Sequence, residues 1–219
     1  MKAVIIGGGI IGLSSAYYLS QAGWEVTIAD TTDLSDSCSY GNLGMVVPSH
    51  FVPLAAPGIV SQGFRWMFDS KSPFYVKPSL SPRLIRWGWK FIRSANASHV
   101  NRSAKPLLDI NLMSRGLYEE ISCDPAFSFS FERKGILMYF RDPHVAEEEV
   151  HLAEKAGSMG LDVAALSKEQ IQQLEPGVQL DILGGVHYRC DAHLYPNQLI
   201  AQMIAVMRQR GVSILGHHI

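Results

Sequence analysis

Residues 4–12 read Val-Ile-Ile-Gly-Gly-Gly-Ile-Ile-Gly, and a helix-like run then leads to Glu25-Val-Thr-Ile-Ala-Asp30. The apolar residues before Gly7 predict a short buried strand, and the glycines predict a tight turn that opens a helix. The apolar residues before Asp30 predict a second strand. Together these features predict a parallel βαβ unit at the N-terminus.

The glycine turn is suited to hold the pyrophosphate of a dinucleotide. Gly7 permits the turn, Gly9 leaves room for phosphates beside the backbone, and Gly12 lets the helix pack close to the sheet. The first-turn N–H groups and the helix dipole would face the same phosphates. The predicted phosphate-binding residues are Gly7, Gly8, Gly9, Ile10, Ile11 and Gly12.

Asp30 follows the second strand at the distance where a carboxylate accepts hydrogen bonds from ribose hydroxyls. A Gly-x-Gly-x-x-Gly sequence alone is a weak signal, because glycine-rich loops are common. Here the turn follows a strand, opens a helix and is followed by an acid, so we prefer a dinucleotide site to a βαβ unit without a ligand. The turn itself does not separate FAD from NAD.

Composition excludes several classes of function. A net charge of -1 over 219 residues gives no general attraction to nucleic acid. The three cysteines, Cys38, Cys123 and Cys190, are scattered and form no Cys-x-x-Cys pair. The histidines have no metal-site spacing, so we predict no metal and no disulfide framework. No apolar run is long enough to span a bilayer, and a cytoplasmic location fits best.

The middle of the chain reads as a long Ser-, Gly- and Pro-rich loop over residues 31–58, followed by mixed helices and strands. Ser167 and Gln170 have the spacing of a capping box before a short helix. Helices are predicted from Pro82, over 104–120, over 143–160 and from Pro196, and strands over 127–131, 135–140, 184–188 and 212–215.

Three segments resemble the D-amino-acid oxidase superfamily of FAD enzymes, and in particular its D-amino-acid dehydrogenase (small subunit) branch. They are the N-terminal unit, the loop Ser37-Cys-Ser-Tyr-Gly-Asn-Leu-Gly-Met45, and Asp191-Ala-His-Leu-Tyr-Pro196. The resemblance implies that the glycine turn holds the FAD pyrophosphate and that Asp30, where many relatives have Glu, binds the adenosine ribose. It also implies that the loop runs along the flavin, with Ser39, Asn42, Gly44 and Met45 at the matching positions.

The resemblance covers this whole chain but only about the N-terminal half of a typical member. It implies an α/β fold in which a Rossmann-like FAD-binding domain, residues 1–50 and 190–219, carries an inserted α+β substrate domain, residues 51–189. The nucleotide-binding sheet has sequence for only two or three strands. We therefore expect that the C-terminal portion of the fold is missing and that this chain alone is catalytically weak or inactive.

By this resemblance the reaction is oxidative deamination of a D-amino acid, with hydride transfer from the α-carbon to flavin N5 and an electron acceptor that is a quinone or oxygen. A glycine- or sarcosine-type amine oxidase of the same superfamily, an NAD enzyme, and a truncated non-catalytic fragment are the alternatives. The catalytic residues stay unassigned. His50, just after the loop, is the one candidate in this half, against the alternative of a solvated loop histidine.

A basic segment lies between Arg65 and Lys105, with Asp69 as its only acid. Arg83, Arg86, Lys90 and Arg93 fall on one helical face, and Trp66, Trp87 and Trp89 are close by. One interpretation is a peripheral contact with the inner membrane. The other is a solvated helix face of the substrate domain, with the tryptophans in its core. We prefer the second interpretation.

Overall fold

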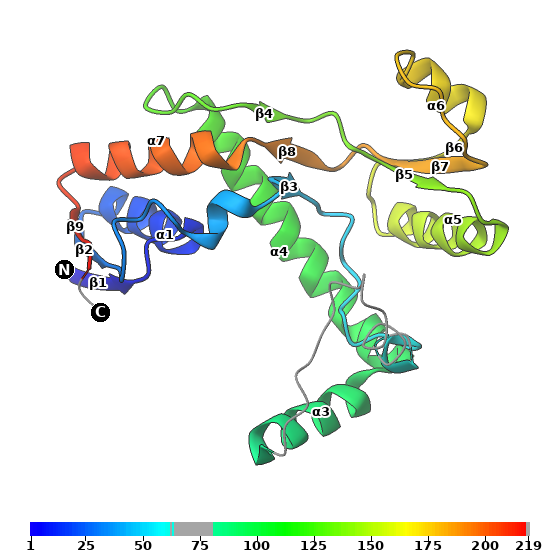
Figure 1. Cartoon of the computed structure of the whole chain (residues 1–219), viewed down its shortest axis with the longest axis horizontal. Coiled ribbons are helices and arrows are strands. Elements are labelled where there is room, and N and C mark those ends of the chain that lie inside the picture. Colours follow the sequence, from blue (N-terminus) through cyan, green and yellow to red (C-terminus); the bar gives the residue numbers. More distant parts are fainter. Residues whose placement is uncertain (62, 64–80, 218–219) are drawn as a thin grey trace. The chain divides into compact units, whose positions relative to one another are not determined.

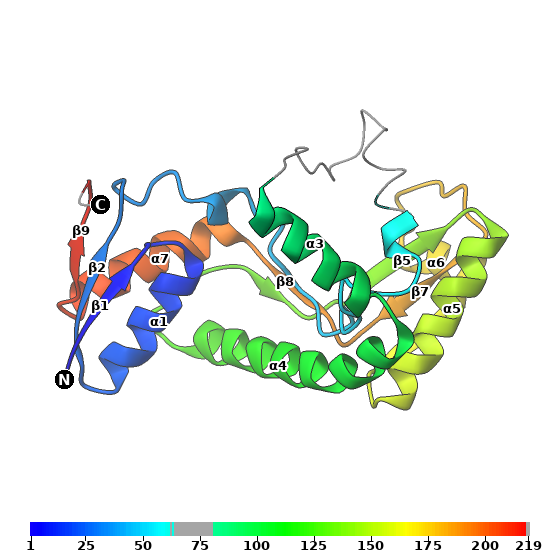
Figure 2. The ribbon, with the colours of Figure 1, turned by 90° about the horizontal axis from the view of Figure 1, so that it is seen from below.

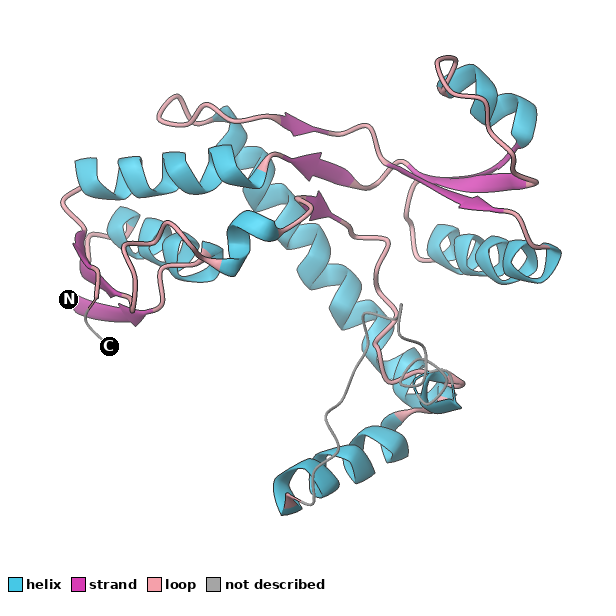
Figure 3. Cartoon of the chain, in the orientation of Figure 1, coloured by secondary structure: helices cyan, strands magenta, loops and turns pink. Residues whose placement is uncertain are grey.

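The computed structural model describes residues 1–61, 63 and 81–217 of the chain, and it has the predicted α/β class. The described residues form two compact units, one made of residues 1–47 and 114–219 and the other of residues 48–113. Figure 3 shows the distribution of helices and strands along the chain. The boundaries expected from the sequence for the FAD-binding and substrate domains stay a prediction.

The first unit begins with the predicted βαβ element: strand β1 (Lys2–Ile6), helix α1 (Ile10–Gln21) and strand β2 (Glu25–Ala29). Strand β9 (Ser213–Leu215), from the end of the chain, completes a parallel sheet in the order β1-β2-β9. Helix α7 (Pro196–Gln209) lies beside α1 (Figure 1). Strands from the beginning and from the end of the sequence therefore build one parallel sheet.

Helices α1 and α7 share one apolar core against this sheet. Leu13 of α1, Ile28 of β2 and Leu199, Met203 and Met207 of α7 are each 1% exposed or less. The four-residue spacing of Leu199, Met203 and Met207 places them on one side of α7.

Two further sheets belong to the same unit. The short strands β3 (Met45–Val46), β8 (Ala192–Leu194) and β4 (Phe131–Glu132) pair antiparallel in the order β3-β8-β4. The strands β5 (Ile136–Phe140), β7 (Gly184–Tyr188) and β6 (Val163–Ser167) form the third sheet, with β7 in the centre. Helices α5 (Pro143–Ser158) and α6 (Lys168–Leu174) pack on opposite sides of it (Figure 1).

The second unit contains helix α3 (Pro82–Ser94) and the beginning of helix α4 (Ala97–Cys123), whose remaining residues belong to the first unit. Figure 2 shows these helices from a second direction. Phe51, Val100, Ala104 and Leu108 are buried in this unit. They provide its small apolar core.

Most of the predicted elements are present. Helices α3, α5 and α7 begin at the predicted prolines, and Ser167 with Gln170 forms the predicted capping box of α6. Helix α4 is longer than the predicted 104–120. It begins earlier because the Asn96 side chain accepts the N–H of His99 and caps the first turn. Pro106 lies inside the helix.

The predicted strand over residues 127–131 is wrong, because only Phe131 and Glu132 pair as a strand. Residues before them are held in a turn by Asp124, whose backbone oxygen accepts from Phe127 N and whose Oδ1 accepts from Ala126 N. The Ser130 N–H bonds to the side chain of Gln198 instead of a strand. Strands β3, β6 and β8 were not predicted, since they are too short or too mixed for a period-two pattern.

Part of the predicted basic segment, including Arg65, Trp66, Asp69, Lys71 and Lys77, lies outside the described residues. Over residues 1–61, 63 and 81–217, none of the helices combines the length and the apolar composition needed to span a bilayer. In the same residues, no three His, Cys, Asp or Glu side chains come together as metal ligands. The expectation of no metal stays a prediction.

Candidate cofactor-binding site

The glycine turn joins β1 to α1 with very little space. Gly7 has φ +98°, and its N–H donates to Ala29 O at 2.8 Å, which ties the turn to the end of β2. A Cβ on Gly12 would lie 1.9 Å from Gly7 O. The absence of a side chain at position 12 therefore sets how closely α1 approaches the strand, which is the role predicted for this glycine.

Gly8 has a role that the sequence did not show. A Cβ at this position would lie 2.1 Å from Cδ2 of Leu34, which is 1% exposed. Leu34 itself has φ +73°, a conformation that costs a residue with a Cβ about 1–2 kcal/mol. The loop after β2 thus places an apolar side chain directly over the turn, and burial of that side chain offsets the backbone strain.

Asp30 lies at the end of β2 and accepts hydrogen bonds from the turn. Its Oδ2 accepts the N–H of Gly8 at 2.6 Å, and its Oδ1 accepts the N–H and the hydroxyl of Thr32 at 3.0 and 3.1 Å. These hydrogen bonds hold the pKa of the Asp30 carboxyl below its usual range. The bond from the Gly8 N–H has the largest effect, followed by the bond from the Thr32 N–H. The carboxylate is therefore ionised near neutrality, with acceptor capacity left on Oδ2.

The loop Ser37–Met45 meets the first turn of α1 through one serine. Ser39 Oγ accepts the N–H of Ile10 at 3.0 Å, and Ser37 Oγ accepts the N–H of Ser39 at 3.2 Å. The same two hydroxyls lie 3.2 and 3.3 Å from where a Cβ of Gly9 would be. Ser39 thus satisfies one N–H that the helix leaves without an internal partner, and it fixes the loop to the turn.

The other end of the loop is fixed to β8 and α7. Asn42 Oδ1 accepts the N–H of Gly44 at 2.7 Å, and Gly44 O accepts the N–H of Leu194 at 2.8 Å. Gly44 has φ +71°, and a Cβ there would lie 2.0 Å from Leu194 O. Two of the three segments that carried the resemblance, Ser37–Met45 and Asp191–Pro196, are therefore in direct contact.

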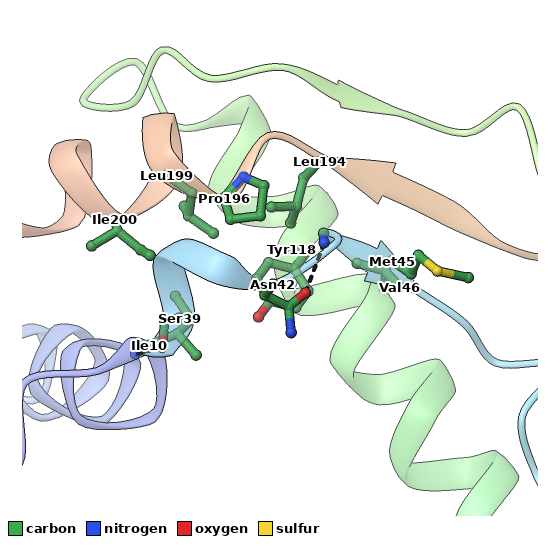
Figure 4. A pocket seen from close by; sticks show the side chains of 11 residues that line it. Ile10, Ser39, Asn42, Met45, Val46, Tyr118, Leu194, Pro196, Leu199 and Ile200 are labelled. Carbon is green, nitrogen blue, oxygen red and sulfur yellow. Dashed lines mark hydrogen bonds between the residues drawn. The ribbon is translucent and has the colours of Figure 1, made fainter. Parts of the chain in front are cut away.

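A cavity of about 130 Å³ lies beside the loop, lined by Ile10, Ser39, Asn42, Gly44, Met45, Val46, Tyr118, Leu194, Pro196, Leu199 and Ile200 (Figure 4). All of these residues belong to the first unit. The cavity is smaller than the ~300–1,000 Å³ of typical ligand pockets, so it adjoins the loop and does not hold a whole dinucleotide.

Tyr118 of α4 lines this cavity, and sequence reasoning missed it. Burial raises the pKa of its hydroxyl above the usual tyrosine value, so it is protonated at neutral pH. The sequence spacing could have indicated that Tyr118 faces inward. Tyr118 lies three residues before Ile121, and Ile121 is 3% exposed and marks the inward face of the helix.

The structure thus brings ten of the predicted residues together around the start of α1 and the adjoining loop: Gly7, Gly8, Gly9, Ile10, Gly12, Asp30, Ser39, Asn42, Gly44 and Met45. Ile11, in the first turn of α1, is 82% exposed. Their roles in binding a cofactor stay predictions.

His50 belongs to the second unit, so the geometry of the first unit does not include it. Its Nδ1 lies 3.2 Å from Ser49 Oγ, and its backbone oxygen accepts from Asn111 Nδ2 at 3.2 Å. Both contacts are local to the second unit. A catalytic role for His50 stays a prediction.

The donor set fits the polar half of a dinucleotide. The first turn of α1 and the Ser39 hydroxyl offer hydrogen-bond donors to phosphate oxygens, and the Asp30 carboxylate offers an acceptor to hydroxyls. Gly9 has no Cβ, and the Ser37 and Ser39 hydroxyls lie 3.2 and 3.3 Å from the position that a Cβ would take.

Curated relatives cover most of this chain. It is 33% identical to D-amino acid dehydrogenase 2 of Ralstonia nicotianae over 192 residues, which are 85% of this chain and 45% of the relative. It is 30% identical to D-amino acid dehydrogenase of Neisseria meningitidis over 210 residues, 91% of this chain and 50% of the relative. The chain spans about half the length of the curated relatives it matches.

Solved structures with the same fold include two oxidases. The glycine oxidase of Geobacillus kaustophilus superposes with a TM-score of 0.64 at 15% identity, covering 98% of this chain and 46% of the oxidase. The FAD-bound L-alpha-glycerophosphate oxidase of Mycoplasma pneumoniae gives 0.63 at 17% identity, covering 98% of this chain and 44% of that one. At these identities the comparison establishes the fold.

The family comparison is decisive for the cofactor, because residues 2–219 match a family described as FAD dependent oxidoreductase. FAD is therefore the cofactor of this family, as predicted, and its binding at the glycine turn stays a prediction. The chain belongs to the FAD dependent oxidoreductase family.

Proposed function

We propose that the natural protein containing this chain oxidatively deaminates D-amino acids with FAD. The observation that carries the proposal is the hydrogen bond from Ile10 N to Ser39 Oγ at 3.0 Å, which joins the predicted phosphate turn to the Ser37–Met45 loop in one site. The names of the relatives, D-amino acid dehydrogenases at about 30% identity, support the choice of substrate class.

Two parts of the chain would bind the polar half of the cofactor. The turn Gly7–Gly12 presents the first-turn N–H groups and the positive end of the α1 dipole to the pyrophosphate. Asp30 would accept hydrogen bonds from the ribose hydroxyls, beside the bond that it already accepts from Gly8 N.

The Ser37–Met45 loop would orient the redox end of the cofactor. FAD, when bound, supplies the chemistry by accepting the α-hydrogen of the amino acid as a hydride at flavin N5. The chain keeps the loop fixed through the Asn42 bond to Gly44 N and the pairing of Met45 with His193. A loop fixed in this way would help to position the flavin against a substrate, and positioning alone can accelerate a transfer without a side-chain base.

Cofactor binding is tested first, with the purified chain, FAD and NADH. We expect the protein to retain flavin absorbance after gel filtration and to quench FAD fluorescence in a saturable way. Replacement of Gly9 by valine fills the space before the helix and should abolish the binding. Binding of NADH without any binding of FAD would contradict the assigned cofactor.

Substrate class is tested with the natural protein, a dye acceptor and matched substrates: D-alanine, L-alanine, glycine and sarcosine. We expect dye reduction and 2-oxo acid formation from D-alanine in preference to L-alanine. Preferred turnover of glycine or sarcosine would instead assign the amine-oxidase alternative, and flavin binding without turnover of any of the four would favour a non-catalytic protein. A parallel assay with oxygen and with a quinone identifies the electron acceptor.

A further inference from the structure

Tyr118 carries a hydroxyl at a position where α4 packs against an apolar core. It lies in the part of α4 that belongs to the first unit, three residues before the buried Ile121. Its ring contacts the core that contains Leu13 and Leu199. A phenylalanine would fill this position equally well. The hydroxyl therefore has another role, because a hydroxyl that loses water without gaining a partner destabilises the fold.

The Tyr118 hydroxyl bonds to no other residue within the part of the chain that the structure describes. Burial is the only cause that raises its pKa, so no neighbouring charge or hydrogen bond acts on it. Its oxygen is nevertheless accessible, unlike the hydroxyls of Tyr18 and Tyr188, which are fully enclosed without a partner. The space that it reaches is the cavity beside the Ser37–Met45 loop, which Tyr118 lines.

This cavity has a polar wall and an apolar wall. The polar side chains are those of Ser39, Asn42 and Tyr118. The apolar wall comes from the end of β8 and the beginning of α7: Leu194, Pro196, Leu199 and Ile200. Figure 4 shows the two groups on opposite sides of the cavity. Such walls suit a ligand with a carbon chain that carries polar atoms along one side.

Each polar side chain keeps a donor that no described residue uses. Ser39 Oγ accepts the N–H of Ile10, and its own O–H is left over. Asn42 uses Oδ1 to accept the N–H of Gly44, so both N–H groups of its Nδ2 are left over. With the Tyr118 O–H, the loop and α4 therefore present several donors to the same cavity.

The cavity also joins the two predicted parts of the cofactor site. Ile10, the first residue of α1, lines it and belongs to the predicted phosphate turn. Met45 lines it too and belongs to the loop predicted to run along the flavin. In FAD the pyrophosphate and the flavin are joined by the ribityl chain, a carbon chain that carries hydroxyls. The ribityl chain thus matches both the location and the two walls of the cavity.

We propose that Tyr118 contacts the cofactor, with its hydroxyl bonded to the ribityl chain of FAD. Because FAD is taken as the bound ligand, this role rests on the function proposed above. Ser39 and Asn42 supply neighbouring donors, and the apolar wall covers the carbon atoms of the chain. A phosphate group in the cavity would use the donors but would leave the apolar wall uncovered. The site therefore includes a residue of α4 in addition to the glycine turn and the loop.

The test compares Tyr118→Phe with the parent protein, both in the 219-residue chain and in the natural protein that contains it. Affinities are measured for FAD and for ADP, which lacks the ribityl chain. We expect the variant to bind FAD about fivefold more weakly and to bind ADP unchanged, since the lost hydrogen bond exists only with FAD. The unfolding free energy of the ligand-free variant should not fall, whereas a purely structural hydroxyl would lower it on removal.

Tyr188→Phe is the matched control. It removes a buried hydroxyl from β7 of the third sheet, and Tyr188 does not line the cavity. Both affinities should stay unchanged. FAD analogues that each lack one ribityl hydroxyl locate the contact. The analogue without the contacted hydroxyl should bind equally to the parent and to Tyr118→Phe, because the bond is then absent from both.

Equal FAD affinity of Tyr118→Phe and the parent would overturn the role of Tyr118 and leave the cofactor assignment intact. Equal weakening of FAD and ADP binding would also overturn it, since the effect would then not depend on the ribityl chain. Failure of both parent proteins to bind FAD would overturn this role and the proposed function together. Normal FAD binding without amino-acid turnover would contradict the proposed reaction alone.

Discussion

Leu194 donates its backbone N–H to Gly44 O over 2.8 Å, while its own oxygen lies 2.0 Å from the position that a Cβ on Gly44 would take. The two residues are 150 positions apart in the sequence. Their contact joins the end of the Ser37–Met45 loop to β8, immediately before α7 begins. The shape of the loop therefore depends on residues from the end of the chain.

We predict that Gly44→Ala disrupts this contact. The substitution places a Cβ at φ +71° and against Leu194 O, and the combination should cost about 2–4 kcal/mol of unfolding free energy. Chemical denaturation measures the loss, and FAD titration should show weaker binding. Gly41→Ala is the control, because a Cβ at Gly41 meets nothing within 4 Å. Equal stability of the two variants would contradict the assigned role of Gly44.

The βαβ unit was predictable because its signals are local. The strand, turn and helix within residues 2–21 follow from apolar pattern and glycine spacing alone, and the closing strand β9 followed from its short apolar run. The first residues of α3, α5 and α7 were likewise predictable, each from a single proline: Pro82, Pro143 and Pro196. Such elements depend little on distant sequence.

The contacts that shape the site were not predictable in this way. The side chain of Leu34 over Gly8 depends on a backbone conformation that leucine rarely adopts, and no local pattern indicates it. Strand β8 is only three residues long and exists because it pairs with β3 and β4 on both sides. Tertiary pairing, not propensity, decides such segments.

Asp30→Asn should change both acid stability and cofactor affinity. The native pKa of Asp30 is lowered, mainly by the Gly8 N–H, so its stabilisation is complete above the unfolded-state pKa and is lost as the pH falls through the native pKa. The variant should show a shallower loss of stability below about pH 4. Its neutral side chain should also weaken FAD binding by about tenfold.

Denaturant titrations over an acid pH series measure the first effect, and FAD titration at neutral pH measures the second. Asp36→Asn serves as the control, since it removes the same charge from an exposed residue of the same loop. If both variants follow the same pH profile, the Gly8 bond to Asp30 does not contribute to acid stability.

Ser39→Ala should remove the hydroxyl that accepts Ile10 N and so leave the first turn of α1 without this cap. We expect a loss of about 1 kcal/mol of unfolding free energy, as for other helix caps. Weaker FAD binding should accompany it, because the loop is no longer held against the turn. Ser158→Ala, at an exposed serine whose hydroxyl donates to the Lys155 carbonyl near the end of α5, should change neither quantity.

Tyr17→Phe should separate stability from cofactor binding. The Tyr17 hydroxyl donates to Asp124 Oδ2 at 2.9 Å, and the Arg210 guanidinium lies 4.7 Å from the Tyr17 ring centroid, so the three residues connect α1 with the residues that follow α4 and α7. Removal of the hydroxyl should cost about 1 kcal/mol. FAD affinity should be unchanged, because the network lies apart from the glycine turn and the loop.

The same substitution should alter stability at alkaline pH. Burial, followed by the bond to Asp124, raises the pKa of Tyr17 in the folded protein. The stabilisation it provides is complete below the unfolded-state pKa near 10 and is lost as the pH rises through the folded-state pKa. Phenylalanine cannot ionise, so Tyr17→Phe should lose less stability between neutral and strongly alkaline pH than the parent protein does. Denaturant titrations at both pH values measure the difference, and an equal loss in the two proteins would show that Tyr17 does not ionise with unfolding.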